Sequence, residues 1–413
     1  MINVRTLKNG LRVVMEPIPF VRSISFGIWI RNGSRNENEG NNGISHFLEH
    51  LMFKGTESRS AMEIAEAMDA VGGQMNAFTA NEYTCFNSRT LDSHFETALE
   101  IVSDIFLNSK FEEEDIEKER NVILEEISMY EDTPEDLVHG LLHNGVWQRN
   151  PLGFMILGTP ESIKNIARGD FIEYYKTHYV AERIIISVAG NMDEDDILNK
   201  LEKVFGSIPR GGEAGIETEK AVYAPSFTAR EKDIEQTHLC VGFPGIPSGS
   251  DESYAMAAVN TLFGGGMSSR LFQKIREERG LAYAVYSFNS GYSDAGLFGV
   301  YSAQTPSQTD DVLRLIIEET RRLFTERITC EQLSKTREQI KSNFLLSLES
   351  SFNRMNSIGR TLMVMNRTVS VEELIEKIDA VDLDMFYNLC EKIFKPEKIS
   401  ISIVGPTAEK IHG

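Results

Sequence analysis

Hydrophobic and polar positions change their period along the chain, and the changes predict alternating strands and helices. The chain opens with a hairpin in which Val4–Leu7 and Leu11–Met15 flank the turn at Lys8–Gly10, because Asn-Gly supplies the positive φ of a tight turn. Ser23–Arg31 alternates as a strand, and Gly43–Gly55 has an apolar helical face that stops at a glycine. Farther along, the pattern predicts helices at about 60–70, 92–107, 112–130 and up to 205, and strands at 75–79, 84–90 and 184–190.

The same order of elements recurs after a segment without period, rich in Pro, Gly, Ala and Glu, between Ser207 and Arg230. A strand at 237–243, helices at 253–263 and 268–278, and strand residues at 283–287 follow it. Glu182–Gly190 also parallels Glu397–Gly405 at a constant offset. We therefore predict an α+β fold made of two similar α+β domains from an internal duplication, with domains at 1–210 and 231–413 and a linker at 211–230.

Composition narrows the class of protein. The 413 residues include 41% hydrophobic and 25% charged residues, as in folded globular proteins. The formal charge of −20 argues against nucleic acid or an anionic membrane as partner and is compatible with basic substrates. No apolar run approaches the roughly 18 residues of a membrane span, and the start lacks a signal-peptide pattern. We expect a cytoplasmic protein with no membrane partner.

The stretch His46-Phe47-Leu48-Glu49-His50 carries the candidate chemistry. Residues three and four apart share a helix face, so His46 and His50 can aim two imidazoles at one point with Glu49 beside them. This is the inverted form of His-Glu-x-x-His, a signature of zinc peptidases. The second part of the chain has Ala257–Thr261 at the corresponding place, without a ligand. The pattern therefore predicts chemistry in the first domain alone.

A zinc site needs a third protein ligand, which we expect on a helix packed against the first. Glu119 and Glu126 lie two turns apart on one face of the predicted helix at 112–130, with Val122 and Ile123 between them. A carboxylate on that face would be costly to bury unless it were paired or bound to a metal. Helix periodicity alone does not decide between Glu125 and Glu126 as the ligand.

His46–Thr56, followed by Glu119-Arg120 and Glu126, resembles the pitrilysin/insulinase zinc metallopeptidases, and most of all the branch of the mitochondrial processing peptidase and its bacterial relatives. The resemblance covers essentially the whole chain. Its spacing from the second histidine implies Glu126 as the third ligand of one zinc ion per chain. It implies that Glu119 orients a histidine or holds the helix, and that Glu49 is the general base of peptide hydrolysis.

Two further segments match the same family. Gly72–Thr79 resembles the edge strand that pairs with the substrate backbone, which implies a substrate-binding role for Asn76, Ala77 and Phe78. Ser268–Tyr283 resembles the segment whose arginine and tyrosine reach the substrate. The resemblance implies the same role for Arg276 and Tyr283. The implied activity is a zinc-dependent endopeptidase or oligopeptidase that holds unfolded peptides as an added strand in a clamshell chamber.

Larger family members enclose their chamber with four such domains, so the resemblance implies a dimer of this chain. Arg276 and Tyr283 would then act in trans on the zinc of the other protomer. An obligate heterodimer with an inactive partner is the alternative assembly, although Gly264–Gly266 resembles the glycine-rich loop of such partners. Two other classes stay open: a non-catalytic scaffold of the same fold, and a small-molecule metal hydrolase or lyase of the autoinducer-synthesising type.

Overall fold

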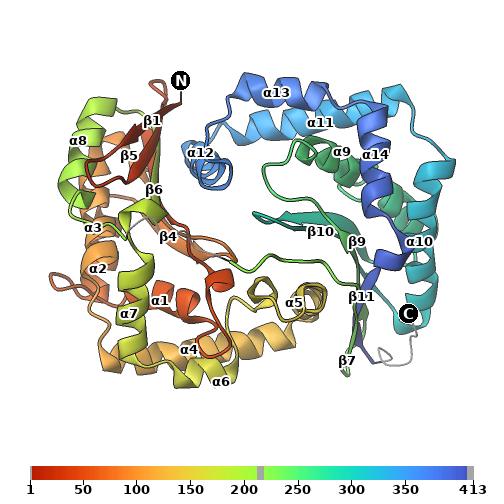
Figure 1. Ribbon diagram of the computed structural model, residues 1–413, viewed down its shortest axis with the longest axis horizontal. Coiled ribbons are helices and arrows are strands. Elements are labelled where there is room, and N and C mark those ends of the chain that lie inside the picture. The colour runs from red at the N-terminus through yellow and green to blue at the C-terminus, as the bar shows by residue number, and fades with distance from the viewer. Residues whose placement is uncertain (1, 212–217, 407–413) are drawn as a thin grey trace. The chain divides into compact units, whose positions relative to one another are not determined.

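The structure is a computed structural model that describes residues 2–211 and 218–406 (Figure 1). Contacts within the chain define two compact units, neither of which is a continuous stretch of sequence. Unit 1 takes Met1–Ile127, Phe154–Thr218 and Leu345–Ser370, and unit 2 takes Ser128–Gly153, Glu219–Phe344 and Val371–Gly413. Each unit therefore contains one segment that comes from the sequence of the other half.

Unit 1 is built on a six-stranded sheet in the order β1-β2-β6-β3-β5-β4. Its strands are β1 (Asn3–Thr6), β2 (Arg12–Pro17), β3 (Ser23–Ile30), β4 (Gln74–Thr79), β5 (Thr84–Leu91) and β6 (Ile184–Gly190). Only β2 and β6 run parallel, and the other neighbours are antiparallel. The predicted opening hairpin is confirmed as β1 and β2. Strand β4 lies at one edge of the sheet, as expected for the segment that ends at Thr79.

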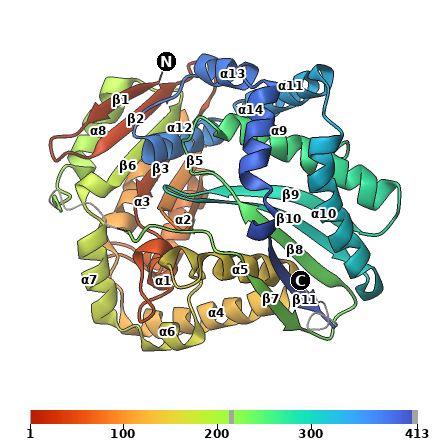
Figure 2. The ribbon, with the colours of Figure 1, turned by 45° about the vertical axis from the view of Figure 1, so that its right-hand side comes forward.

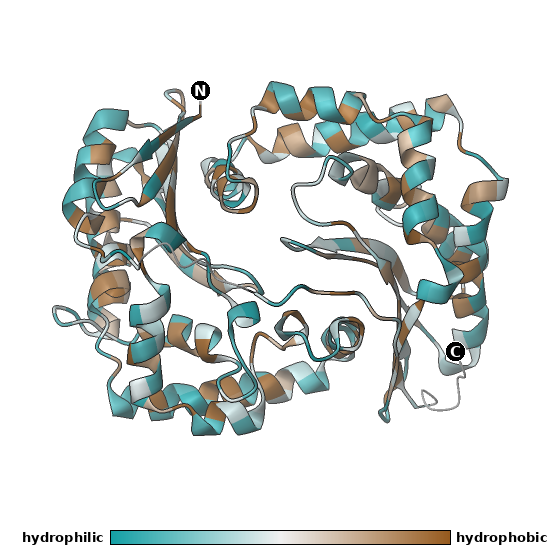
Figure 3. Ribbon diagram, viewed as in Figure 1, coloured by the Kyte–Doolittle hydropathy of each residue, from teal (hydrophilic) through white to brown (hydrophobic). Residues whose placement is uncertain are grey.

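One face of this sheet carries most of the unit's helices. They are α1 (Ile44–Met52), α2 (Ala61–Ala70), α3 (Phe95–Asn108), α4 (Glu113–Asp132, in this unit as far as Ile127), α6 (Pro160–Asn165), α7 (Arg168–His178) and α8 (Glu194–Phe205). Phe26 and Ile28 of β3 pack in one core with Phe47 of α1, Val102 of α3 and Leu201 of α8. Figure 3 shows hydrophobic and hydrophilic residues alternating along these helices, and each of the helices contributes buried apolar residues to this core.

The opposite face of the sheet is covered by α12 (Ser351–Met365), which comes from the second half of the sequence. Met355 and Leu362 of α12 form a core with Trp29 and Ile185 of the sheet. The predicted strand at Ser23–Arg31 is confirmed as β3, and it is buried on both faces. Its small residues serve as packing sites, because a Cβ on Gly27 would lie 2.7 Å from Met355 Sδ.

Unit 2 has a five-stranded sheet in the order β7-β11-β8-β10-β9. Its strands are β7 (Phe227–Glu231), β8 (Thr237–Pro244), β9 (Ala284–Gly291), β10 (Gly296–Gln304) and β11 (Ser400–Gly405). Here β11 is parallel to β7 and antiparallel to β8, as β6 is to β2 and β3 in unit 1. The two sheets thus share their strand order and directions apart from β1. This confirms the predicted α+β fold with two similar halves.

Unit 2 also takes one helix from the other half of the sequence. Its helices are α5 (Pro134–Trp147), α9 (Ser253–Phe263), the π-helix η5 (Phe272–Glu277), α10 (Thr309–Thr325), α11 (Cys330–Ser347, in this unit as far as Phe344), α13 (Val371–Asp379) and α14 (Leu383–Ile393). Helix α5 packs on β11 and β8, as Figure 2 shows. Short 3-10 turns complete the chain: η1 (Ser34–Asn36), η2 (Asp92–His94), η3 (Pro151–Gly153), η4 (Ala181–Arg183), η6 (Pro306–Gln308) and η7 (Pro396–Lys398).

The two compact units are discontinuous in sequence, whereas the predicted domains 1–210 and 231–413 are continuous. The predicted domain bounds describe the repeat in the sequence, and they stay a prediction. Residues 212–217 of the expected linker 211–230 lie outside the described residues, and β7 begins within that linker. Among the helices of the described residues, none combines the length and the hydropathy that crossing a membrane requires.

Candidate metal centre

Helix α1 places the first half of the candidate site. Its apolar residues Phe47, Leu48 and Leu51 are fully buried in the core, and this fixes the rotation of the helix. His46 and His50 then emerge on the adjacent face with their ring centroids 4.6 Å apart. The predicted helix and the shared face of its two histidines are both confirmed.

A buried carboxylate holds the N-terminus of α1. The N-cap residue, Gly43, has φ 94° and no side chain that could accept a hydrogen bond from the first turn. Glu37 supplies the acceptor instead: its Oε2 accepts from Gly43 N at 2.7 Å and Asn42 Nδ2 at 2.9 Å, and its Oε1 accepts from Ser45 N at 2.9 Å. Burial raises the pKa of Glu37, and these hydrogen bonds oppose the rise. A carboxylate at this position also interacts favourably with the helix dipole.

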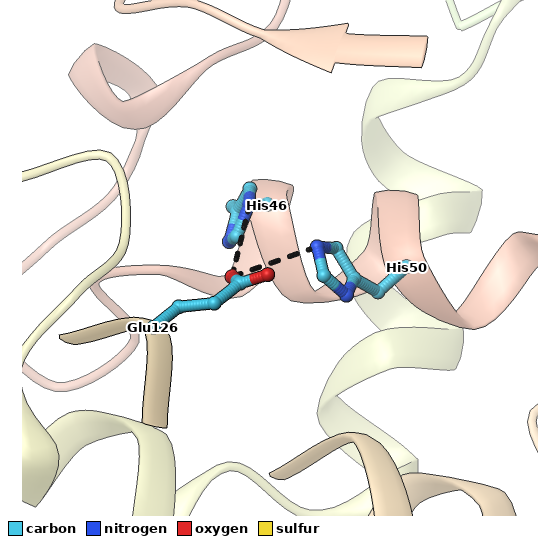
Figure 4. Close-up of side chains that lie close together, drawn as sticks. All are labelled: His46, His50 and Glu126. Atoms are coloured by element: carbon cyan, nitrogen blue, oxygen red, sulfur yellow. Dashed lines mark ion pairs between the residues drawn. The ribbon is translucent and has the colours of Figure 1, made fainter. Parts of the chain in front are cut away.

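Helix α4 places the third candidate ligand. Glu126 Oε2 lies 3.9 Å from His46 Nε2 and 3.8 Å from His50 Nε2, and Figure 4 shows its carboxylate between the two imidazoles. One ligand atom from each of the three residues lies within 4.8 Å of the others. Glu125 is exposed on the neighbouring face of the helix. Of the two glutamates that the sequence pattern left open, Glu126 is the one that meets the histidines.

The three side chains fit a zinc ion. Two imidazole nitrogens and a carboxylate oxygen form a usual protein donor set for zinc, and a tetrahedral ion with bonds of about 2.0–2.1 Å separates its ligand atoms by roughly 3.4 Å. The observed separations of 3.8 and 3.9 Å are slightly longer. Glu126 Oε2 is buried without a hydrogen-bond partner among the described residues. A metal ion would satisfy this oxygen.

The surroundings of the two histidine rings differ in burial and in the hydrogen-bond partner of Nδ1. Burial, and then the charge of His50, lower the pKa of His46 to about 4, so its ring is neutral and can bind a metal at neutral pH. Its Nδ1 is buried and has no hydrogen-bond partner among the described residues. His50 Nδ1 instead lies 3.1 Å from Glu119 Oε2, an acceptor that directs Nε2 of the same ring toward Glu126. Glu119 therefore lies where an orienting carboxylate is expected.

Glu49 lies beside this group and is 8% exposed. Burial raises the pKa of Glu49, while a hydrogen bond from Thr79 and the charge of His50 lower it. The Thr79 bond is 2.5 Å long and reaches Glu49 Oε2 from the edge strand β4. A buried carboxylate with a raised pKa beside candidate metal ligands is suited to act as a general base.

The predicted substrate-binding residues lie on β4. Their exposure alternates: Asn76 and Phe78 are exposed, whereas Ala77 is partly buried against the core. One edge of β4 pairs with β5, and β4 ends the strand order on its other side. Within the described residues no strand pairs with that second edge, so an extended peptide can add to the sheet there.

Arg276 and Tyr283 belong to unit 2, and the structure relates them to each other. The Arg276 guanidinium lies 5.7 Å from the centroid of the Tyr283 ring and 4.8 Å from that of Phe272. Tyr283 is 77% exposed. Arg276 is on the π-helix η5, whereas the sequence predicted an ordinary helix there. Such helices are frequent at functional sites.

Three residues near the candidate metal centre were not singled out from the sequence: Glu37, Thr79 as a partner of Glu49, and Lys54 as a partner of Glu119. For Glu37 a signal exists, because a helix that begins at Gly43 has no capping side chain of its own and needs an acceptor from elsewhere. For Thr79 and Lys54, the partners are brought together only by the tertiary fold.

Comparison with known proteins gives a consistent result. Residues 12–160 match the family described as insulinase (peptidase family M16), and residues 165–340 match the peptidase M16 inactive domain. A Bacillus subtilis protein named as an uncharacterized zinc protease is 41% identical over 408 residues, which cover 98% of this chain and 99% of that protein. A Streptomyces coelicolor protein with the same description is 39% identical, with 98% and 90% covered.

Solved structures agree with the fold. A protease from Helicobacter pylori superimposes with a TM-score of 0.92 at 23% identity and covers 98% of this chain and 99% of its own. A Pseudomonas fluorescens structure described as a peptidase M16 inactive domain has the same TM-score at 18% identity, with 98% of each chain covered. At these identities the likeness concerns the fold alone.

Proposed function

Because the chain belongs to the insulinase family of peptidases, family M16, we propose that it is a zinc-dependent endopeptidase or oligopeptidase that hydrolyses unfolded peptides. The observation that carries the proposal is the convergence of His46, His50 and Glu126, with Glu49 on the same helix as the two histidines. Relatives named zinc proteases support the same metal and the same class of reaction.

His46, His50 and Glu126 would hold one zinc ion per chain. Zinc bound there would lower the pKa of a water molecule toward neutrality and polarise the scissile carbonyl. Glu49 would accept a proton from the attacking water and deliver it to the leaving amine. Its burial keeps it away from bulk water, and the Thr79 hydroxyl fixes one of its oxygens.

The substrate would bind as an added strand on β4. Main-chain hydrogen bonds grip an extended peptide without reading its side chains, so unfolded peptides are favoured over folded proteins. Asn76, Ala77 and Phe78 would contact that peptide. The net charge of −20 favours basic peptides as substrates.

We place Arg276 and Tyr283 at the substrate as well, where they would stabilise the developing negative charge on the carbonyl oxygen or anchor the peptide. Arg276 and Tyr283 are both exposed and lie beside each other, so both side chains are open to the same ligand. We propose a cytoplasmic homodimer in which both residues act in trans within a clamshell chamber.

The trans arrangement has a direct test. Glu49→Gln and Arg276→Ala chains, each inactive alone, are mixed and re-equilibrated, and mixed dimers are isolated by two different affinity tags. Part of the wild-type activity should return, because each mixed dimer contains one site with both an intact Glu49 and an intact Arg276. Mixed dimers without activity would exclude action in trans.

The first test of the function compares the wild type with Glu49→Gln, both confirmed to be loaded with zinc, on a basic unstructured peptide. Glu49→Gln should reduce cleavage by roughly 10²–10⁴-fold and keep the metal, because a general base contributes about that factor. Glu126→Gln should lose zinc, and its matched control Glu125→Gln should keep both zinc and activity. Equal cleavage by the wild type and Glu49→Gln would contradict the mechanism. Zinc binding without cleavage in either would favour a non-catalytic scaffold.

A further inference from the structure

One carboxylate, that of Glu119, joins a metal-facing histidine to a lysine. Its Oε2 lies 3.1 Å from His50 Nδ1, and its Oε1 lies 2.6 Å from Lys54 Nζ. Because the two contacts use different oxygens, both can form at the same time. Lys54 comes next after Phe53, the C-cap residue of α1, and Glu119 is on α4, so the pair also links the two helices that carry the candidate ligands.

Glu119 needs a counter-ion because it is 5% exposed. A buried carboxylate is stable only when it is paired or fully hydrogen-bonded. The neighbouring Arg120 is used elsewhere, since its guanidinium donates to the backbone carbonyls of Ile163 and Ile166. The side chain of Lys54 supplies this positive charge through its ion pair with Glu119.

The two histidines depend on this arrangement to different degrees. His50 has an acceptor for its Nδ1–H, whereas Nδ1 of His46 is buried without a partner. An acceptor behind a histidine fixes which ring nitrogen is free for the metal and where it points. A displacement of Glu119 should therefore weaken the metal site through His50.

We propose that Lys54 is a positioning residue for the metal site: it holds Glu119 in the orientation that accepts the Nδ1–H of His50 and leaves His50 Nε2 for zinc. This inference rests on the proposed zinc site. The competing explanation is that Lys54 stabilises only the C-terminal end of α1, where a cation interacts favourably with the helix dipole. The two explanations differ in whether the effect of Lys54 depends on Glu119.

A double-mutant cycle on the full chain separates them. The zinc dissociation constant is measured by competition with a chromophoric chelator for the wild type, Lys54→Met, Glu119→Gln and the double variant. We expect Glu119→Gln to weaken zinc binding by about 10–100-fold and Lys54→Met by several-fold. The double variant should bind zinc no more weakly than Glu119→Gln, because Lys54 acts through the carboxylate that is already removed.

Two further variants complete the design. Lys54→Arg keeps the charge and should restore most of the zinc affinity. Lys118→Met removes a lysine from an exposed ion pair with Glu114 on α4 and should leave the affinity unchanged. The visible spectrum of the cobalt-substituted protein gives a second readout, since a reoriented His50 changes the ligand field in Lys54→Met and not in Lys118→Met.

The inference is overturned if Lys54→Met binds zinc as the wild type does, or if it weakens binding by the same factor with and without Glu119. If Lys54→Met alone does not fold, the cycle is run with Lys54→Gln and Lys54→Arg, whose comparison decides in the same way. A wild type that does not bind zinc would overturn the proposed function itself. Normal zinc binding in the wild type with no effect of Lys54 would overturn only this inference.

Discussion

The hydroxyl of Thr79, on the edge strand β4, donates a 2.5 Å hydrogen bond to the carboxylate of Glu49 on α1. It joins the strand proposed to bind the peptide to the residue proposed to act as the base. The bond stabilises the ionised carboxylate, so it lowers the pKa of Glu49 against the rise that burial causes. The pKa of Glu49 therefore depends on a residue of the strand that we propose to bind the peptide.

Thr79→Val should shift the pH dependence of cleavage. Without the hydroxyl the pKa of Glu49 rises further, and because the base must be ionised to accept a proton, the acidic limb of kcat/KM moves to higher pH. On that limb we expect a loss of rate of roughly 10- to 100-fold, since a hydrogen bond to a charged group is worth roughly 1.5–3 kcal/mol. Thr79→Ser keeps the donor and should retain the wild-type profile. Identical profiles for Thr79→Val and the wild type would exclude this role.

Glu37→Gln should destabilise the metal-free protein by about 1–3 kcal/mol. Both carboxylate oxygens accept hydrogen bonds from donors at the start of α1, so an amide NH₂ in either place would face another donor. Urea unfolding measures the change. Glu39→Gln, an exposed neighbour on the same loop, is the matched control and should change the stability little. Equal effects of the two variants would show that the cap contributes nothing.

Much of unit 1 could be predicted from the sequence because its signals are local. The turn at Asn9-Gly10, the apolar face of α1 and the capping box that begins α2 at Ser60 all depend on neighbours in sequence. The position of Glu126 relative to the histidines depends on how α4 packs against α1. Periodicity therefore left Glu125 and Glu126 open, and only the family spacing separated them.

The exchanged helices could not be predicted, for a physical reason. The face of β3 that carries Ser25 and Gly27 is typical of an exposed or loosely covered surface, since small and polar residues alternate with apolar ones. In the structure, Ser25 Oγ lies 3.2 Å from Ser351 Oγ, and Gly27 admits Met355. Small residues occur both on solvent-exposed faces of strands and where a helix packs closely on a sheet. Sequence periodicity does not distinguish these two environments.

Gly359→Ala tests this close contact. A Cβ on Gly359 of α12 would lie 2.3 Å from Trp29 Nε1, which is fixed by a 2.8 Å hydrogen bond to Ser187 Oγ. We expect a loss of about 1–3 kcal/mol from overpacking, although alanine favours a helix more than glycine. Gly169→Ala on α7 is the control, because nothing lies within 4 Å of the added methyl group. It should keep the stability or raise it by up to about 1 kcal/mol.

Protonation of His143 should destabilise unit 2 at acidic pH. Burial lowers the pKa of His143 on α5 to about 4, from an ordinary value of 6.5, and its Nε2 lies 2.9 Å from Tyr292 Oη. The stabilisation by the neutral ring is complete above pH 6.5 and is lost as the pH falls from 6.5 to 4, with an upper limit of roughly 3 kcal/mol. His143→Gln should flatten the fall of the unfolding free energy between these pH values.

The exchange of α5 and α12 predicts that neither half of the sequence folds by itself. A fragment of residues 1–210 lacks α12, so Trp29 and Ile185 on the second face of its sheet are left uncovered, while its own α5 has lost the strands β8 and β11 on which it packs. Exposed apolar area of this kind leads to aggregation. The fragment 231–413 has the converse defect.

Each fragment expressed alone should be insoluble or show no cooperative unfolding, whereas the two expressed together should give a soluble pair with the unfolding transition of the full chain. The same pair with Gly359→Leu in the second fragment should fail to assemble, since the larger side chain blocks the contact with Trp29. A soluble fragment 1–210 with a cooperative transition would show that unit 1 is stable without α12. Helix α12 would then not be required for the stable fold of unit 1.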